Sequence, residues 1–453
     1  MSMRSVTIHQ SRCRSDSTKQ KFHSVTFSSE ATQLERPAMS RLPTARLIRS
    51  LILTSLMSSK LFLRPALGLL KLVTHSKSGV FDPDRNWILN KFLRWTVYDH
   101  FCAGTNRNEV AKTIARVKSM GFQGVILGYS KEIVIDPDIP TSTHDINLAL
   151  HSSQDDRAIE EWKDKTLETL RMVGSGDFLA MKLTGAGPLA VRLMKERQPM
   201  PTIIATAVDV ICKEAQKQGS RLWLDAEQQV LQHGLDDWAI EMMRKYNRSP
   251  HPLVYNTIQA YLKGSTANLD RHLLSATQEG WSVGIKLVRG AYIEHETRSL
   301  IHDCKEDTDR SYDFLANRIL CRVMPDHGNH LAFPDAALFL ATHNAESASK
   351  AISVHRNCLM SGQPTVSLDC GQIQGMADEL GCELAQNYER ACRQDRDGDV
   401  TFPKTFKCMA WGSVGECLQY LHRRAIENKG AVERTEHMLQ ALRKELRRRL
   451  LGF

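Results

Sequence analysis

Eight short apolar runs, separated by longer stretches of helical spacing, constrain the fold of this chain more than any other feature. Strands that alternate with helices form right-handed βαβ units around a parallel sheet. Eight such units favour a closed (βα)8 TIM-type barrel of the α/β class, which typically takes ~250 residues plus insertions. A doubly wound open sheet is the alternative. The predicted strands are 124–130, 178–184, 221–227, 253–261, 282–292, 337–344, 365–372 and 405–412.

The rest of the chain is assigned by its position relative to these strands. We expect residues 121–453 to form the barrel with its C-terminal helices, and residues 41–120 to form an amphipathic and helical arm. Residues 131–165 are expected to form a polar excursion, and residues 322–336 a loop rich in turn residues. Residues 1–40 differ in composition and are expected to lie outside the barrel.

The positive charge of the chain is concentrated at its N-terminus. The net charge is +9, but residues 1–78 hold 8 Arg and 5 Lys against 3 acidic residues, and residues 79–453 hold 47 basic and 48 acidic groups. A neutral body lacks the positive surface that binds a polyphosphate, so we expect no nucleic-acid partner. The eleven cysteines include no C-x-x-C pair, which favours reduced thiols over a disulfide framework or a zinc site.

The first 73 residues contain two distinct segments. Residues 1–40 are rich in Ser, Thr and Arg and poor in acidic residues, which is typical of a mitochondrial transit segment; a disordered tail is the alternative. Residues 42–73 have apolar residues at helical spacing, but Lys60, Arg64 and Pro65 interrupt them, so no transmembrane span is expected. This second segment either packs on the barrel or lies on a membrane surface.

Polar residues follow several predicted strands at their C-terminal ends, where barrel enzymes place their chemistry. Each alone has a structural explanation, because Asp225, for example, could cap the next helix. Six polar positions at the same end of successive strands are harder to explain in that way. They are Lys182, Asp225, Gln259, Lys286, Arg289 and the Thr342-His343-Asn344 run.

The last predicted helix of the barrel, residues 413–428, adds a second group. Tyr420, Arg423, Arg424 and Glu427 fall within a sector of about 100° when each residue turns the helix by ~100°. A solvated charged face is the ordinary interpretation. However, two adjacent guanidinium groups just after the final strand can also grip a carboxylate, so this face is a candidate clamp.

Two short motifs resemble known binding motifs but lack the sequence context that these motifs require. The G-x-G-x-x-A match at 185–190 is not followed by a second strand that ends in an acidic residue, as a dinucleotide fold would require. The His pair at 327–330 lies in a predicted loop without a third metal ligand. With no nucleophile motif or metal cluster, the site is expected to position a substrate for a bound cofactor.

Five segments occur in an order that the sequence shares with a known family: LDAEQQ, QAYLK, KLVRGAY, ATHN and YLxRRxxEN. With them, the chain resembles proline dehydrogenase (proline oxidase) of the fungal mitochondrial type from residue 101 to residue 435. The resemblance implies a barrel that binds FAD and oxidises L-proline to 1-pyrroline-5-carboxylate, the first step of proline catabolism. It also implies electron transfer to the quinone pool and peripheral association with the matrix face of the inner mitochondrial membrane.

The resemblance also implies roles for individual residues. Those around proline are Lys182, Asp225, Tyr420, Arg423 and Arg424. Those that contact FAD are Gln259, Lys286, Val288, Arg289, Gly290, Ala291, Tyr292, Thr342, His343, Asn344 and Glu427.

Two positions depart from the family pattern. Cys408 stands where family members often have a tyrosine that lines the substrate pocket, so the pocket is either wider here or filled by another aromatic such as Trp411. Lys286 stands where some members have an arginine, which keeps the charge but loses the forked geometry.

Two other functions remain as alternatives. One is a Schiff-base aldolase on the same barrel, with Lys182 or Lys286 as the nucleophile. The other is a non-catalytic membrane-associated scaffold that uses residues 42–73 and the basic segment 443–449.

Overall fold

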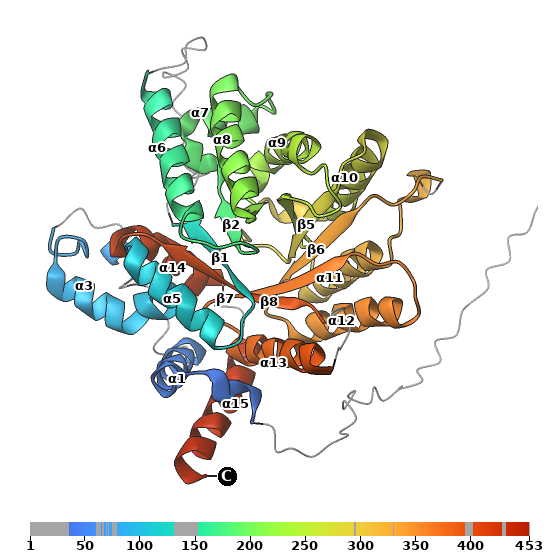
Figure 1. Cartoon of the computed structure of the whole chain (residues 1–453). Helices are drawn as coiled ribbons and strands as arrows, with labels where there is room; N and C mark the ends of the chain where they lie inside the picture. The colour runs from blue at the N-terminus through green and yellow to red at the C-terminus, as the bar shows by residue number, and fades with distance from the viewer. Residues whose placement is uncertain are drawn as a thin grey trace, which may run out of the picture. The chain divides into compact units, whose positions relative to one another are not determined.

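In a computed structural model of the chain, the eight predicted strands form a closed parallel barrel (Figure 1). Each strand pairs with the next in chain order, and β8 pairs with β1 to close the sheet. The barrel is therefore confirmed, and the doubly wound alternative is wrong. The strands are β1 Gly124–Tyr129, β2 Phe178–Met181, β3 Arg221–Leu224, β4 Val254–Gln259, β5 Val283–Val288, β6 Ala336–Ala341, β7 Ser367–Ile373 and β8 Lys404–Trp411.

The structure describes seven stretches and a few positions between residues 60 and 78. The stretches are 36–59, 79–130, 153–293, 296–328, 330–394, 402–427 and 432–452. The chain divides into two compact units, Met1–Pro37 and Ala38–Phe453, and the account below concerns the second. The predicted transit segment lies almost wholly outside the described residues.

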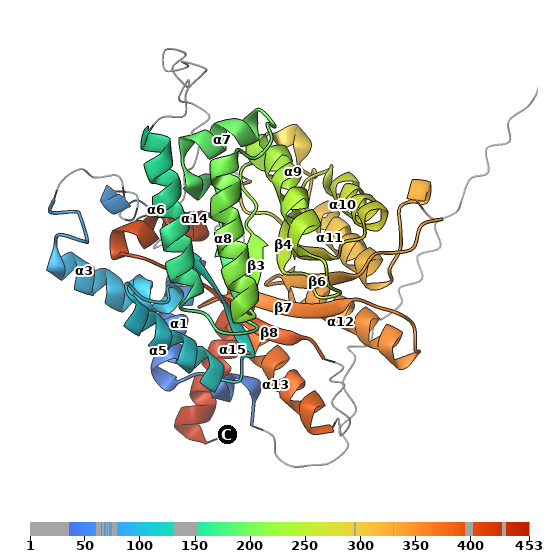
Figure 2. The ribbon, with the colours of Figure 1, turned by 45° about the horizontal axis from the view of Figure 1, so that its top comes forward.

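Helices surround the sheet on its outer side (Figures 1 and 2). The helices that precede β1 are η1 Ala38–Arg41, α1 Thr44–Ser58, α3 Trp87–Leu93, the π-helical turn η2 Arg94–Tyr98, α4 Asp99–Phe101 and α5 Arg107–Ser119. Those between the strands are α6 Ser153–Leu170, η3 Leu183–Ala186, α7 Pro188–Lys195, α8 Thr202–Gln218, α9 Gln229–Tyr246, α10 Ser265–Glu279, η4 Arg298–Leu300, α11 Lys305–Leu320, η5 Asp326–Gly328, α12 Ala345–Met360 and α13 Asp378–Gln394. Among the described residues, two helices follow β8: α14 Val414–Glu427 and α15 Val432–Leu451.

Several strands end earlier than the apolar pattern predicts. β2 ends at Met181, β3 at Leu224 and β5 at Val288, although the predicted runs continue three or four residues further. The paired register of β2 and β3 stops at Met181 and Leu224. Beyond it, Asp225 N still donates to the Met181 carbonyl at 3.0 Å, and the chain after β2 enters η3. The predicted excursion at 131–165 is also too long, because α6 begins at Ser153.

The barrel interior changes in side-chain size from one end to the other. Near the N-terminal end, Arg221 bonds Asp369 at 2.8 Å and lies 3.9 Å from the ring centroid of Phe178. The middle is filled by large side chains: Ile126, Phe178, Trp223, Tyr255, Phe339 and Phe406. At the C-terminal end the strands carry small residues, among them Gly128, Ala180, Ala341, Gly371 and Cys408. The core thus closes one end of the barrel and leaves room at the other.

The N-terminal arm packs on the barrel with one face of α1. Leu47, Ser50 and Thr54 are buried, whereas the apolar side chains of Ile48 and Ile52 are 42% and 53% exposed. This face of α1 is in contact with α13, where Ser50 Oγ donates to Asp378 at 3.2 Å, while its other face stays exposed. Within the described part of the chain, every helix is too short or too polar to cross a bilayer.

Candidate active site

A cavity of about 260 Å³ opens at the C-terminal ends of the strands, where the small interior residues leave space. Most predicted site residues line it. They are Lys182, Asp225, Gln259, Lys286, Val288, Arg289, Gly290, Ala291, Tyr292, Thr342, His343, Asn344 and Tyr420. These residues come from five strand ends and from α14, so the fold brings together side chains that are as much as 238 positions apart in the sequence, which is the separation of Lys182 and Tyr420.

Asp225 is bonded to two lysines in the wall of this cavity. Its Oδ2 accepts from Lys182 Nζ at 2.7 Å, and its Oδ1 accepts from Lys286 Nζ at 2.6 Å. Burial raises the pKa of Asp225, but the two ammonium groups outweigh burial and hold that pKa below its usual range. Because two cations share one carboxylate, the cluster carries one positive charge in excess. That excess suits an anionic ligand.

The lysines reach Asp225 because interior positions recur every second residue along a strand. In β5, this period carries the inward face from Gly284 to Lys286, whose Nζ lies 4.1 Å from the centroid of the Trp223 ring. A cation above an indole face is stabilised by the ring quadrupole. Trp223 therefore supports Lys286 from below, on the side away from the cavity opening.

Glu227 is a buried carboxyl group that the sequence analysis did not single out. It is 3% exposed, and its Oε1 accepts a hydrogen bond from Thr184 Oγ1 at 2.9 Å. Burial raises the pKa of Glu227 to about 7. The sequence offered one sign of its role, because it lies two residues after Asp225 in the same predicted strand. Its burial, which the sequence does not report, is what distinguishes it from an ordinary helix-capping residue.

Buried polar atoms without a partner also line the cavity. Among the described residues, Gln259 Oε1 and Trp223 Nε1 make no hydrogen bond. Gln259 is held through its Nε2, which donates to the Glu227 carbonyl at 3.5 Å. Native proteins rarely leave such atoms unsatisfied, so they indicate hydrogen bonds to a bound molecule.

Arg289 is fixed against the wall by three polar contacts. Its Nε donates to Asp309 at 2.7 Å, its Nη1 to Thr342 Oγ1 at 2.9 Å and its Nη2 to Ser347 Oγ at 2.8 Å. Its guanidinium also lies 4.4 Å from the Tyr312 ring centroid. The side chain is thus preorganised, and the cationic group keeps one position at the cavity edge.

The backbone beside Arg289 packs closely against the ring of Tyr261 because residue 290 is a glycine. Gly290 has a φ of +148°, and a Cβ there would lie 2.5 Å from the ring of Tyr261. A larger residue would need both a strained backbone and a displaced aromatic ring. This explains why a small residue is needed in the Lys286–Tyr292 segment.

The Thr342-His343-Asn344 run joins β6 to α12. Asn344 Oδ1 caps α12 by accepting from Ser347 N at 3.1 Å. His343 Nε2 accepts from Ile373 N at 3.1 Å, which leaves the ring proton on Nδ1 in the neutral imidazole. All three residues line the cavity, and their contacts fix the orientation of its wall.

The α14 residues are only partly described. Tyr420 is 6% exposed and lines the cavity, so the predicted helix presents its aromatic to the site. Arg423, Arg424 and Glu427 lie on α14 as predicted, but their side chains are outside the described part of the structure.

Cys408 and Trp411 point to opposite sides of β8. Cys408 lines the cavity. Trp411 packs outside the barrel, where its Nε1 donates to Thr169 Oγ1 of α6 at 2.9 Å. The suggestion that Trp411 fills the space of the missing tyrosine is therefore wrong: residues 408 and 411 are an odd number of positions apart, so they face opposite sides of the strand.

Comparisons with known proteins agree with this arrangement. The family model described as "Proline dehydrogenase" matches residues 110–437. A probable mitochondrial proline dehydrogenase of Schizosaccharomyces pombe is 27% identical over 81% of this chain and 82% of that protein. The human mitochondrial proline dehydrogenase 1 is 32% identical over 58% of this chain and 41% of the human protein. A rat hydroxyproline dehydrogenase is 27% identical over 80% of this chain and 83% of that protein.

A solved structure shares the fold. Proline utilization A from Bdellovibrio bacteriovorus has a TM-score of 0.60 and 14% identity, covering 88% of this chain and 40% of the bacterial one. The chain thus spans most of the yeast relative but less than half of the human and bacterial proteins. Since the family model covers most of the chain, the fold and the sequence lead to the same conclusion: this chain belongs to the proline dehydrogenase family.

Proposed function

We propose that this protein oxidises L-proline to 1-pyrroline-5-carboxylate with FAD as its cofactor and passes the electrons to a membrane quinone. When bound, FAD would supply the two-electron oxidation of the C5–N bond of proline, and the residues of the protein would position the substrate and manage its charge and proton. The observation that carries the proposal is the cluster of Lys182, Asp225 and Lys286 in the cavity wall, with its excess positive charge.

The residues around the cavity fit a flavin. The flavin ring edge offers both hydrogen-bond donors and acceptors, and the unpaired Gln259 Oε1 is a buried acceptor at the site. Arg289 supplies a fixed cation at the cavity edge, and Gly290 lines the cavity beside it without a side chain. We assign the cofactor contacts to Gln259, Lys286, Val288, Arg289, Gly290, Ala291, Tyr292, Thr342, His343, Asn344 and Glu427.

The proline carboxylate is assigned to the cationic side of the cavity. Lys182 has its ammonium group at Asp225 and at the cavity surface, and Arg423 and Arg424 follow Tyr420 on α14. Charge-assisted hydrogen bonds to a carboxylate are among the stronger polar contacts in proteins. In this assignment, Asp225 is a positioning residue that keeps two lysines at fixed points, and Tyr420 covers the pyrrolidine ring.

The cationic cluster also affects the proton on the substrate. Proline must lose a proton from its ammonium group before C5 gives up a hydride, because the lone pair forms the C=N bond of the product. Nearby positive charges disfavour a second cation and so lower the pKa of the bound amine. The net change is the loss of one hydride and one proton from proline.

The cellular assignment rests on the relatives and on the N-terminal sequence. The yeast and human relatives are named mitochondrial. Residues 1–40 have the composition of a transit segment. We therefore place the protein in mitochondria, on the matrix side, with a peripheral contact to the inner membrane where a quinone is available.

A Schiff-base aldolase is less well supported by the same geometry. A lysine nucleophile must be neutral, whereas both Lys182 and Lys286 are ion-paired to Asp225. The family assignment also favours an oxidoreductase over a scaffold.

The proposal is tested by the visible absorption of the purified protein before and after L-proline is added. We expect a flavin band that bleaches anaerobically with proline. A colourless protein that borohydride couples to a carbonyl substrate would instead support the aldolase.

Replacement of the arginine pair tests the carboxylate clamp. We expect Arg423→Met or Arg424→Met to raise the KM for proline and to cost roughly 2–4 kcal/mol of transition-state stabilisation. An unchanged kcat/KM in both variants, with an unchanged melting temperature, would remove these residues from the substrate site.

A further inference from the structure

An exposed aromatic surface lies on α3 and on the π-helical turn η2 that follows it, outside the barrel. Trp87, Ile88, Phe92 and Trp95 are 66%, 64%, 52% and 69% exposed, and Lys91 lies among them. We call these five residues the α3 aromatic face. Each tryptophan leaves about two-thirds of its surface in water. This exposure is unfavourable, because burial of apolar area lowers the free energy by ~25 cal/mol per Å². A patch of this kind usually marks an interaction site.

The α3 aromatic face is held in a fixed position. Asn86 caps α3, and its Oδ1 accepts from Ile88 N at 3.1 Å and from Leu89 N at 3.2 Å. Asn90 Nδ2 donates to the carbonyl of Pro83 at 2.8 Å. Leu93, on the opposite side of the helix, is buried against α14. The exposed side chains are therefore presented by an ordered element, with the apolar core on its other side.

The segments on either side of α3 are anchored to the end of β8 and to the residues that follow it. Tyr98 OH donates to the Gly412 carbonyl at 2.6 Å, and Ala103 N donates to the Ala410 carbonyl of β8 at 2.8 Å. Asp84, just before α3, accepts from Ser413 Oγ at 2.7 Å. Since Ala410 lines the cavity, the α3 aromatic face belongs to the same corner of the fold as the candidate active site.

The charge within the face indicates what covers it. The Lys91 ammonium lies 5.1 Å from the Trp87 ring centroid and has no carboxylate partner among the described residues. A protein partner would need to bury this charge, and the cores of protein interfaces are depleted in lysine. At a bilayer, the ammonium instead reaches the headgroup phosphates while the rings stay among the acyl chains. Tryptophan is also enriched at this membrane depth.

We propose that the α3 aromatic face inserts into the interfacial layer of an anionic lipid bilayer. The inference rests on the proposed function, in which the electron acceptor is a quinone dissolved in the membrane. It adds the surface through which the protein contacts that membrane. The helix lies in the headgroup region and does not span the bilayer. The active-site corner then lies against the membrane surface, where a quinone can approach.

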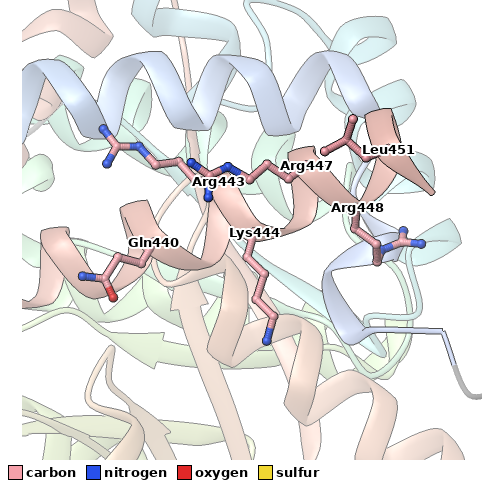
Figure 3. Close-up of a pocket in the computed structure, with 6 residues that line it drawn as sticks. All are labelled: Gln440, Arg443, Lys444, Arg447, Arg448 and Leu451. Carbon is pink, nitrogen blue, oxygen red and sulfur yellow. The ribbon is translucent and has the colours of Figure 1, made fainter. Parts of the chain in front are cut away.

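A basic row on α15 is the competing surface. Arg443, Lys444 and Arg447 of this helix line a hollow of about 410 Å³ (Figure 3). They offer cations but lack the exposed aromatic rings that insert below the headgroups. Charge attraction alone would be weakened by salt, whereas apolar insertion would not.

The test compares three variants of the full-length holoprotein for binding to vesicles of phosphatidylcholine and phosphatidylglycerol. The first is Trp87→Ser/Trp95→Ser. The second is Phe314→Ser/Met360→Ser, which removes two side chains that are 53% and 76% exposed elsewhere. The third is Arg443→Gln/Lys444→Gln/Arg447→Gln. We expect the first variant to bind at least about tenfold more weakly than wild type, and the second to bind equally well.

Three results would overturn the proposal. One is equal vesicle binding by the tryptophan variant and wild type. Another is loss of binding in the α15 variant while the tryptophan variant still binds. The third is a wild-type dimer that the tryptophan variant dissociates without lipid, since the face would then join two copies. Tryptophan emission gives a direct readout, because insertion should shift it to shorter wavelength in wild type but not in the tryptophan variant.

Proline oxidation with a soluble dye is measured in the same preparations. We expect the tryptophan variant to keep this activity and to lose turnover with a quinone held in the vesicles. If no preparation oxidises proline, the proposed function is wrong. The vesicle-binding measurements still test the α3 aromatic face, because they do not depend on proline oxidation.

Discussion

Two buried lysine–aspartate contacts in this protein use the same chemistry in different surroundings. Lys407 of β8 bonds Asp378 at 3.0 Å, and the two side chains are 2% and 1% exposed. In the cavity, Lys182 bonds Asp225 at 2.7 Å with 16% and 19% exposure. In both cases burial raises the pKa of the aspartate, but neighbouring cations outweigh it and lower that pKa.

The two aspartates differ in their second hydrogen-bond partner. Ser50 of α1 donates to Asp378 Oδ2 at 3.2 Å. A side chain of the protein therefore takes the remaining place beside this pair, which we call the closed pair. Asp225 instead receives a second lysine and faces a cavity. The closed pair therefore ties α1 to β8 and α13, whereas the open cluster borders a cavity that a ligand can enter.

Breaking the closed pair should have the largest effect on stability. We expect Lys407→Met to lower the free energy of unfolding by about 3–5 kcal/mol, because Asp378 would keep a buried charge without its main partner. Urea unfolding measures this loss. The double variant Lys407→Met/Asp378→Leu should recover part of it. A loss below about 1 kcal/mol in the single variant would show that the pair is not structurally important.

Breaking the open cluster should mainly affect catalysis. We expect Asp225→Asn to reduce kcat/KM for proline by about 30- to 1,000-fold, equivalent to about 2–4 kcal/mol, because both lysines lose their anchor. Asp303→Asn is the matched control, since Asp303 is 79% exposed and bonds Lys263 at the surface. If the two variants had the same kinetics, the positioning role of Asp225 would be refuted.

Glu227 extends the comparison to a buried carboxyl group that is hydrogen-bonded to a hydroxyl rather than ion-paired. Its folded pKa of about 7 lies above the unfolded value of 4.5. The folded state therefore binds the proton more tightly than the unfolded state does. The contribution of this proton to the free energy of unfolding is present at pH 4.5 and is lost as the pH rises to about 7. The loss amounts to at most about 3 kcal/mol.

The variant Glu227→Gln tests this pH dependence. We expect its free energy of unfolding, relative to that of wild type, to increase between pH 5 and pH 8. Chemical unfolding at these two values measures the difference. A constant difference between the two proteins at both pH values would mean that Glu227 does not titrate in this window.

Cys408 tests how much room the open site has. Its thiol faces the cavity, and Trp411, on the opposite side of β8, cannot fill the space. We expect wild type to discriminate against hydroxyproline less strongly than the Cys408→Tyr variant does. The ratio of kcat/KM for proline to kcat/KM for hydroxyproline should differ between the two proteins by about 10- to 200-fold at most. The ratio of kcat/KM for proline to that for hydroxyproline in each protein measures this. An identical ratio would place residue 408 away from the substrate.

The smallest effect is expected from removal of the N-terminus. Met39 is 6% exposed, and its carbonyl accepts from Arg449 at 3.0 Å, so the truncation should end before it, at residue 35. We expect deletion of residues 2–35 to leave turnover with a soluble dye unchanged and to abolish mitochondrial import. Normal import of the truncated protein would refute the transit assignment.

Much of the barrel and its active end could be predicted from local patterns. The apolar runs located all eight strands, and polar residues after them marked the cavity wall. The strand ends were less accurate, because β2 and β3 stop where pairing stops rather than where the apolar run does. Glu227 was missed for a related reason: its distinctive property is burial, which no local pattern reports.

The sequence by itself determined which residues alternate inward, because the two-residue period of a strand is a property of the backbone. That period placed Lys182, Asp225 and Lys286 on the inner face of the barrel. Only the tertiary structure decided that Asp225 holds both lysines, that Asp378 is closed by Ser50, and that Trp87 and Trp95 stay exposed. Each of these depends on closure of the barrel and docking of the arm, which bring together groups separated by up to hundreds of residues and so leave no signal in local spacing.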